Sequence, residues 1–246
     1  MRAIAVVVVL LCLVTATSVA DAAGKRPAKH HEKAKTKKRV ALTTPAKPST
    51  VETKNKRDRS IGAPWSGRLQ TPARLNAGER YHLRRPWRTY GTRTTVELVR
   101  QAIVDTLDGA PKAHILAVGD LSQESGGWIT EHASHQSGRD VDIGLFFKKK
   151  PAGYPAAFVR ATPSTLDLAA TWKLIWNFAR TRTEDGGAQF IFLDRSLQTA
   201  LYRWAEKQGI SDKRIASVAA VLRHEPNHDN HIHVRFKCRE RDTSCR

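Results

Sequence analysis

Cysteine is scarce in this sequence, and the patterns that turn serine or cysteine into a covalent nucleophile are missing. The three cysteines are Cys12, Cys238 and Cys245, and no two of them form the C-x-x-C pair that is typical of a local metal or redox site. No serine lies in the G-x-S-x-G motif that exposes a nucleophilic hydroxyl at a sharp turn. The sequence therefore offers no activated serine or cysteine nucleophile.

Long apolar runs are equally scarce, since the one candidate lies near the N-terminus. Residues 4–14 are apolar, follow Arg2 and precede small residues that end near Ala20 or Ala22. This order is typical of a cleaved signal peptide, and the run is too short to span a membrane comfortably. We expect residues 1–22 to be a signal peptide and the mature protein to be periplasmic or secreted. An uncleaved membrane anchor is the alternative.

Acidic residues are outnumbered by basic ones. The chain has 23 Asp and Glu against 42 Lys and Arg, which gives a formal net charge of +19. Thirteen of the bases and only three of the acids lie in residues 24–60, where large apolar side chains are almost absent. Such a composition does not support a packed core, so we expect residues 23–60 to be a basic disordered linker. It would attract anionic envelope polymers through an interaction that salt screens; a solvated linker without a partner is the alternative.

Strong positive charge is also typical of proteins that bind nucleic acids. Here the charge is concentrated in residues 24–60, and no helix of the remainder has the pattern of a basic recognition element. A signal peptide would also carry the protein away from nucleic acid. We therefore expect no nucleic-acid partner, and a secreted metal-dependent nuclease is the weaker alternative.

Two cysteines remain once a signal peptide is removed. Cys238 and Cys245 are separated by six residues near the C-terminus. A disulfide between them would restrain the tail, and oxidising compartments permit it. Two free thiols or a local metal site are the alternatives.

Histidine is gathered in two segments that offer metal ligands. The first, HASHQSGRDVD at residues 132–142, places His135 and Asp142 on either side of a six-residue spacer. The second, HDNHIHV at residues 228–234, puts His231 and His233 on one face of an extended strand, because alternate side chains share a face. The opposite face carries Ile232 and its apolar neighbours, so one face is directed at a core and the other is available for chemistry.

These residues suit a catalytic zinc, which takes three protein ligands and keeps one position open for water. His135, Asp142 and His233 supply the three ligands, and His231 is then free to act on the water. Isolated histidines on a polar face are usually only solvated, but six fall in or near the two segments: His132, His135, His224, His228, His231 and His233. The sequence thus predicts a metal site that forms where the two segments meet.

Residues 61–246 are expected to form one α+β domain around this zinc site. Apolar spacing predicts a helix from Thr94 to Gly109, a helix at residues 164–182, and a helix that contains Leu197 and ends near Gly209. Strands are predicted at residues 115–118, 141–147 and 189–193. We expect a small antiparallel sheet that carries the metal site, flanked by helices that cover its other side.

The run GDLSQESGGWITEHASHQSGRDVDIGLFF at residues 119–147 resembles the core of penicillin-insensitive murein endopeptidases, and HDNHIHVRF at residues 228–236 also matches. These enzymes belong to a group of zinc peptidases named after lysostaphin, D-alanyl-D-alanine peptidases and the hedgehog signalling domain. Members share an H-x6-D motif and an H-x-H motif on a small antiparallel sheet. The resemblance covers roughly residues 60–236 and is firmest around the two motifs.

The resemblance implies that His135, Asp142 and His233 bind Zn²⁺, with His231 and His228 beside the water and the scissile amide. In some members the histidine at the position of His132 helps to hold a further metal, so His132 is a weaker ligand candidate, and we expect one functional zinc. The implied substrate is the peptide bridge of peptidoglycan, cut between D-alanine and meso-diaminopimelate. His231 would act as the base and His228 would steady the oxyanion, although these two roles are interchangeable at this point.

Two other functions stay open. A D,D- or L,D-carboxypeptidase would use the same chemistry on single stem peptides, and a wall-binding module would keep the fold without catalysis. Asp140 either orients a ligating histidine from behind or faces solvent. The sequence leaves the oligomeric state open.

Overall fold

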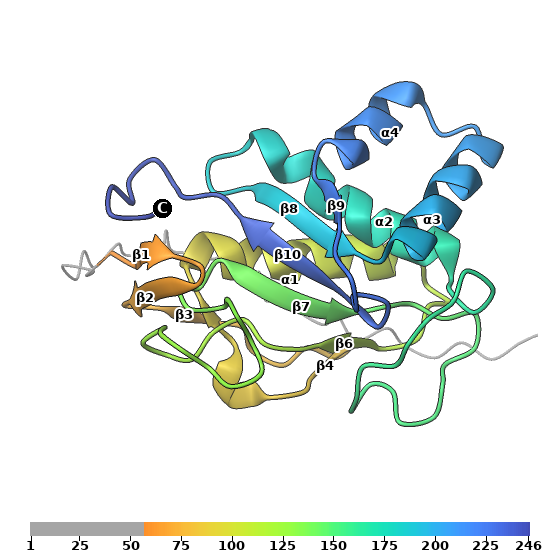
Figure 1. Cartoon of the computed structure of the whole chain (residues 1–246). Coiled ribbons are helices and arrows are strands. Elements are labelled where there is room, and N and C mark those ends of the chain that lie inside the picture. Colours follow the sequence, from red (N-terminus) through yellow and green to blue (C-terminus); the bar gives the residue numbers. More distant parts are fainter. Residues whose placement is uncertain (1–56) are drawn as a thin grey trace, which may run out of the picture. The chain divides into compact units, whose positions relative to one another are not determined.

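The computed structural model describes residues 57–246 (Figure 1). The expected signal peptide and nearly all of the expected basic linker lie outside the described residues. Within the described part of the chain, no helix is long and apolar enough to cross a membrane.

The main sheet has six strands in the order β4-β6-β7-β10-β8-β9. Its strands are β4 (Tyr81–Leu83), β6 (Leu116–Val118), β7 (Asp140–Gly144), β8 (Ala188–Leu193), β9 (Leu222–His224) and β10 (His231–Phe236). The α+β class is confirmed, but the expected small antiparallel sheet is corrected to a larger mixed one. The inner pairs are antiparallel, whereas β4 pairs with β6 and β8 pairs with β9 in parallel. The edge strands β4 and β9 have three residues each, too few for a periodic sequence pattern.

Four α-helices accompany the sheet in the described part of the chain. They are α1 (Arg93–Asp108), α2 (Leu168–Ala179), α3 (Arg195–Lys207) and α4 (Asp212–Ala219), with short 3-10 turns at η1 (Pro86–Arg88) and η2 (Arg180–Thr183). The first three confirm the predicted helices, but α2 begins later than predicted. Residues 162–165 form a tight turn first, in which the Thr165 amide donates to the Thr162 carbonyl, and the Asp167 side chain then caps α2 by accepting from the Ala170 amide.

The predicted strands are confirmed with shifted ends. The strand predicted at residues 141–147 becomes β7, which already includes Asp140 and stops at Gly144. Two further pairs of strands were not predicted. These are the hairpin of β1 (Arg59–Ala63) with β2 (Ser66–Gln70) and the pair of β3 (Ala73–Arg74) with β5 (Tyr90–Gly91).

The core lies on one face of the main sheet, against α1 and α2, which pass behind it in Figure 1. Ile232, Val234 and Phe236 point into this core and are completely buried. Phe236 packs edge-on against Phe178 of α2, with ring centroids 6.0 Å apart. Because burial of such side chains stabilises by roughly 1.5–3 kcal/mol each, the apolar face of β10 fixes which face its histidines occupy.

The end of the chain is fastened to the first of the described strands. Cys238 and Cys245 form a disulfide, which confirms the expected pairing. The segment between them runs beside β1, where the Gly62 amide donates to the Ser244 carbonyl at 2.8 Å. The disulfide therefore holds the tail against the β1–β2 hairpin.

Candidate metal and catalytic site

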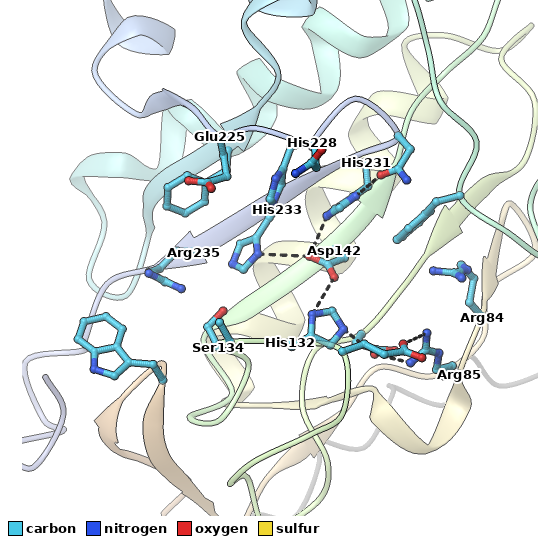
Figure 2. Close-up of a pocket in the computed structure, with 18 residues that line it drawn as sticks. Arg84, Arg85, His132, Ser134, Asp142, Glu225, His228, His231, His233 and Arg235 are labelled. Atoms are coloured by element: carbon cyan, nitrogen blue, oxygen red, sulfur yellow. Dashed lines mark hydrogen bonds and ion pairs between the residues drawn. The ribbon is translucent and has the colours of Figure 1, made fainter.

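The two histidine segments meet because β7 and β10 are antiparallel neighbours in the centre of the sheet. Their register places His233 opposite Asp142 and Arg235 opposite Asp140. Alternate residues of a strand share a face, so these four side chains leave the sheet on the side away from the core. Figure 2 shows contacts from three histidines converging on Asp142.

A tight loop before β7 brings His135 to the same point. His135 is fully buried and has φ +67°, a left-handed conformation that is uncommon for a residue with a bulky side chain. Two hydrogen bonds hold it: its amide donates to Asp140 Oδ2 at 3.0 Å and its Nδ1 donates to the Leu121 carbonyl at 2.8 Å. The ring is therefore fixed with Nε2 aimed at Asp142 and available as a ligand.

The ligand atoms lie close together around Asp142. His135 Nε2 is 3.3 Å and His233 Nδ1 is 3.4 Å from Asp142 Oδ1, and His132 Nδ1 is 3.6 Å from Asp142 Oδ2. His135 Nε2 and Asp142 Oδ1 are buried and have no hydrogen-bond partner among the described residues. Buried polar atoms are normally satisfied, so this pair of orphaned atoms fits a cation with imidazole and carboxylate ligands such as zinc.

His132 belongs to the tightest part of this group. Its ligand atom and those of His135 and Asp142 all lie within 4.8 Å of one another. His132 Nε2 is 2.9 Å from Asp120 Oδ2, and Arg85 and Arg88 bind the same carboxylate oxygen at 3.1 and 2.9 Å. The structure thus brings all four predicted ligand candidates together, with His132 on one side of Asp142 and His233 on the other.

Asp140 is the second carboxylate of the site and is completely buried. Its Oδ1 accepts from His233 Nε2 at 3.0 Å and from Arg235 Nε at 2.8 Å, while Oδ2 accepts from the His135 amide. Because His233 donates through Nε2, its Nδ1 is left free to face Asp142. Asp140 therefore orients two of the candidate ligands and does not face solvent.

His231 lies beside the ligand cluster with its own support. Its Nδ1 donates to Asn230 Oδ1 at 2.5 Å, and its Nε2 lies 3.6 Å from Asp142 Oδ1. The ring stacks on Phe158, with centroids 5.1 Å apart and an angle of 8° between the planes. His228 lies next to it, with ring centroids 4.7 Å apart, but has no ion pair with Asp142 among the described residues.

Burial and charge divide the histidines into two kinds. Burial lowers the pKa of His231 to about 4, although the Asp142 carboxylate acts in the opposite direction. His231 is therefore neutral near pH 7 and able to accept a proton. Burial also lowers the pKa of His135, but the charges of Asp142 and Asp140 outweigh it and raise that pKa to about 9. The same two carboxylates that favour a proton on His135 would also favour a bound cation.

His132, Asp142, His231 and His233 line one wall of a cavity of about 560 Å³, whereas His135 and Asp140 are buried and do not line it. Among the other residues that line it, basic, aromatic and acidic side chains recur: Trp65, Arg84, Arg85, Asp120, Glu131, Phe158, Phe192, Glu225 and Arg235. Figure 2 shows Arg84 and Arg85 on one side of Asp142 and Arg235 on the other. A substrate in this cavity would lie between aromatic surfaces and guanidinium groups.

Several of these residues were missed by sequence reasoning. Asp120 follows β6 closely and lies within the motif run, so its place near a strand end was a usable signal. Arg84, Phe158 and Trp65 come from a strand end, a loop and a hairpin turn that carry no recognisable motif. Their approach to the cavity depends on the packing of segments far apart in sequence.

Comparisons with known proteins agree with this geometry. A family model described as penicillin-insensitive murein endopeptidase matches residues 60–246, a range that contains both histidine segments, the disulfide and all the residues of the cavity. No curated protein matches the sequence. The chain therefore belongs to the penicillin-insensitive murein endopeptidase family, a family of peptidases that act on the peptidoglycan of the cell wall.

Proposed function

We propose that this protein is a zinc metalloendopeptidase that hydrolyses peptidoglycan cross-links at the D-alanyl to meso-diaminopimelyl amide bond. The observation that carries the proposal is the group of lone pairs around one point: His135 Nε2 and His233 Nδ1 lie within 3.4 Å of Asp142 Oδ1. Two of these three atoms are buried without a hydrogen bond in the described residues. A resident cation accounts for that arrangement.

His135, Asp142 and His233 are the proposed ligands. Bound zinc would supply Lewis acidity, lowering the pKa of a water molecule and polarising the amide carbonyl. His132 is the weaker ligand candidate. Its Nδ1 also faces Asp142, while its Nε2 is held by Asp120. Asp140 and the Leu121 carbonyl fix the ring orientations of His233 and His135 in advance.

His231 is the proposed proton carrier. Its Nδ1 donates to Asn230, so Nε2 can accept a proton from the attacking water. The oxygen then adds to the amide carbon, the carbon–nitrogen bond breaks, and His231 returns the proton to the leaving amine. His228 is placed beside His231 to steady the negative oxygen that develops, and the stack on Phe158 keeps the His231 ring in position.

Insensitivity to penicillin follows from this chemistry. β-Lactams act by acylating a serine nucleophile, and the proposed mechanism has none. Ser134 lines the cavity, but no G-x-S-x-G turn surrounds it. A water molecule activated in the site is not trapped as a stable acyl-enzyme.

Purified cross-linked muropeptide dimers, incubated with the protein in the presence and absence of a chelator, test the proposal. Mass spectrometry should detect chelator-sensitive conversion to monomers, restored by added zinc. Loss of a terminal residue from intact dimers would instead favour the carboxypeptidase. Unchanged dimers at every zinc concentration would favour the wall-binding module, and full activity after demonstrated metal removal would refute the metallopeptidase.

A cell-wall substrate places the protein in the periplasm or outside the cell, and we propose that residues 1–22 direct that export. Sequencing of the N-terminus of the protein recovered from the envelope tests this step, and an intact Met1 would contradict it.

We also propose that residues 24–59 strengthen wall binding through their charge. Deletion of residues 24–56, which keeps the buried Asp58 and strand β1, should weaken binding to isolated wall at low ionic strength and leave binding at high salt unchanged.

A further inference from the structure

Arg84 differs from the other arginines of the cavity in how its charge is used. Arg85 is paired with Asp120 and Glu131, and Arg235 is paired with Asp140. Arg84 donates through Nε to the Ala156 carbonyl at 3.2 Å, and among residues 57–246 its two terminal nitrogens have no hydrogen bond and no carboxylate within ion-pair distance. The cavity therefore presents one guanidinium without an anionic partner in the described part of the chain.

The position of Arg84 is fixed before any ligand arrives. It directly follows β4, and its amide donates to the Val118 carbonyl at 2.9 Å, which continues the pairing with β6. Its guanidinium carbon lies 4.1 Å from the centre of the Phe158 ring. An arginine held by a carbonyl and an aromatic ring, with two nitrogens still free, is ready to bind a carboxylate through two parallel hydrogen bonds.

The location relates Arg84 to one side of the scissile bond. The same Phe158 ring stacks on His231, so a single aromatic side chain links the guanidinium to the group that returns the proton to the leaving nitrogen. Diaminopimelate has two carbons that each carry an amino group and a carboxylate. In the proposed substrate, the scissile amide is made by the amino group of the carbon at the end of the side chain, so the carbon attached to the leaving nitrogen also carries a carboxylate. A carboxylate on that carbon would come close to the Phe158 side of His231, where Arg84 lies.

We propose that Arg84 is a specificity-determining residue that binds the free carboxylate of the diaminopimelyl residue on the leaving side of the cross-link. The inference rests on the proposed function, since it takes its substrate from there. It predicts that the protein prefers cross-links in which this carboxylate is free over cross-links in which it is amidated. Amidation removes the negative charge and replaces one acceptor oxygen by a nitrogen that donates. The Arg84 guanidinium can then no longer form two parallel hydrogen bonds with this group.

Kinetics on matched dimers test the proposal. One dimer carries the free carboxylate, the second is amidated there, and the third is amidated only at the glutamyl carboxylate. The wild-type protein should cleave the first and third with similar kcat/KM and the second about 10- to 100-fold more slowly, the range expected for a charged hydrogen-bonded pair. Arg84→Gln should lower kcat/KM for the first dimer to that of the second and leave the second unchanged. Arg84→Lys should recover part of the difference, and Arg203→Gln, an exposed arginine on α3 outside the cavity, should change nothing.

Equal rates of wild-type cleavage on the first and second dimers would overturn the proposal. So would an equal loss on both dimers in Arg84→Gln, because that result would mean that Arg84 only supports Phe158 and His231. Calorimetric binding of monomeric stem peptides, with free or amidated diaminopimelate, provides a readout that does not need catalysis. If no dimer is cleaved, the proposed function fails, yet tighter binding of the free form that disappears in Arg84→Gln still supports the carboxylate site, and equal binding refutes it.

Discussion

His231 and His233 are two positions apart on β10 and share a face, but their hydrogen bonds differ. His233 donates to a buried carboxylate and turns its free nitrogen towards Asp142, whereas His231 donates to an amide oxygen and stacks on Phe158. We therefore expect His233→Ala to lose zinc and activity together. His231→Ala should keep most of the zinc and lose about 10²- to 10⁴-fold in kcat. Metal analysis beside steady-state kinetics separates the two, and stoichiometric zinc loss in His231→Ala would reverse the assignment.

Asp140 carries a prediction of its own, because it does not line the cavity and acts through its neighbours. Replacement by Asn keeps the shape but removes the charge that pairs with His233 and Arg235. We expect Asp140→Asn to weaken zinc affinity by about 10- to 100-fold, as measured by competition with a chelating dye. Asp108→Asn, at an exposed ion pair with Arg80, is the matched control and should bind zinc normally. Equal affinity in both variants would show that Asp140 does not tune the site.

The sequence was a good guide to the residues that lie on regular strands or in the tight loop before them. Strand alternation put Asp142 and His233 on the face opposite the apolar residues, and the register confirms that they are neighbours. The role of Asp140 stayed undecided, since burial depends on what covers the strand. Arg84 could not be found, because its significance comes from two contacts, Ala156 and Phe158, that lie more than 70 residues away in the chain.

The C-terminal segment shows how a covalent link supports an element that borders the site. Cys238 and Cys245 close a short loop that is paired with Gly62 of β1. The β1–β2 hairpin in turn contacts the loop that carries His135, where the Gln136 amide donates to the Pro64 carbonyl at 2.9 Å. Breaking the disulfide should therefore destabilise the β1–β2 hairpin more than the main sheet.

Replacement of both cysteines by serine should lower the free energy of unfolding by about 2.5 kcal/mol, the loop-entropy value for a closed loop of this size. Urea denaturation of the variant and of wild-type protein, with and without a reducing agent, measures the effect. Reduction should shift the wild-type curve to that of the variant and leave the variant unchanged. Coincident curves for oxidised wild type and variant would contradict the prediction.

Among the helices, length decided what could be predicted. Helices α1, α2 and α3 span at least 12 residues each, so their apolar spacing repeats over several turns. Helix α4 has 8 residues, and β3 and β5 have 2 each, which leaves no period to detect. The edge strands β4 and β9 were also missed, although β6 of the same length was predicted, because the run at residues 115–118 is mostly apolar whereas His82, Arg223 and His224 interrupt the edge strands. The true size of the sheet was missed with them.

The stability of the whole domain should depend on pH through Asp58, which is buried beside Arg239 and Arg241. Burial raises the pKa of Asp58, but the Arg93 amide and Arg239 lower it more, and the net pKa is below its ordinary value. A lowered pKa stabilises the fold above the unfolded-state pKa of about 4 and loses that effect as the pH falls through the folded-state value.

Asp58→Asn should therefore lower the free energy of unfolding by about 3 kcal/mol at pH 7, the cost of breaking a buried ion pair. The difference from wild type should shrink steadily below about pH 4. Urea titrations of both proteins from neutral pH down through the range in which carboxylates titrate measure it. A difference that stays constant across that range would mean that the charge of Asp58 does not contribute.

The central place of β10 also determines when the site can exist. Synthesis makes this strand near the end of the described residues, yet it pairs with β7, whose residues come far earlier in the chain, and with β8, which lies between them in sequence. Such distant pairings form late and slowly in folding, and here they bring His233 to a loop that was made long before. A nascent chain that still lacks β10 has His135 and Asp142 but neither His231 nor His233, so the proposed ligands and the proposed base come together only after β10 has been made and has paired.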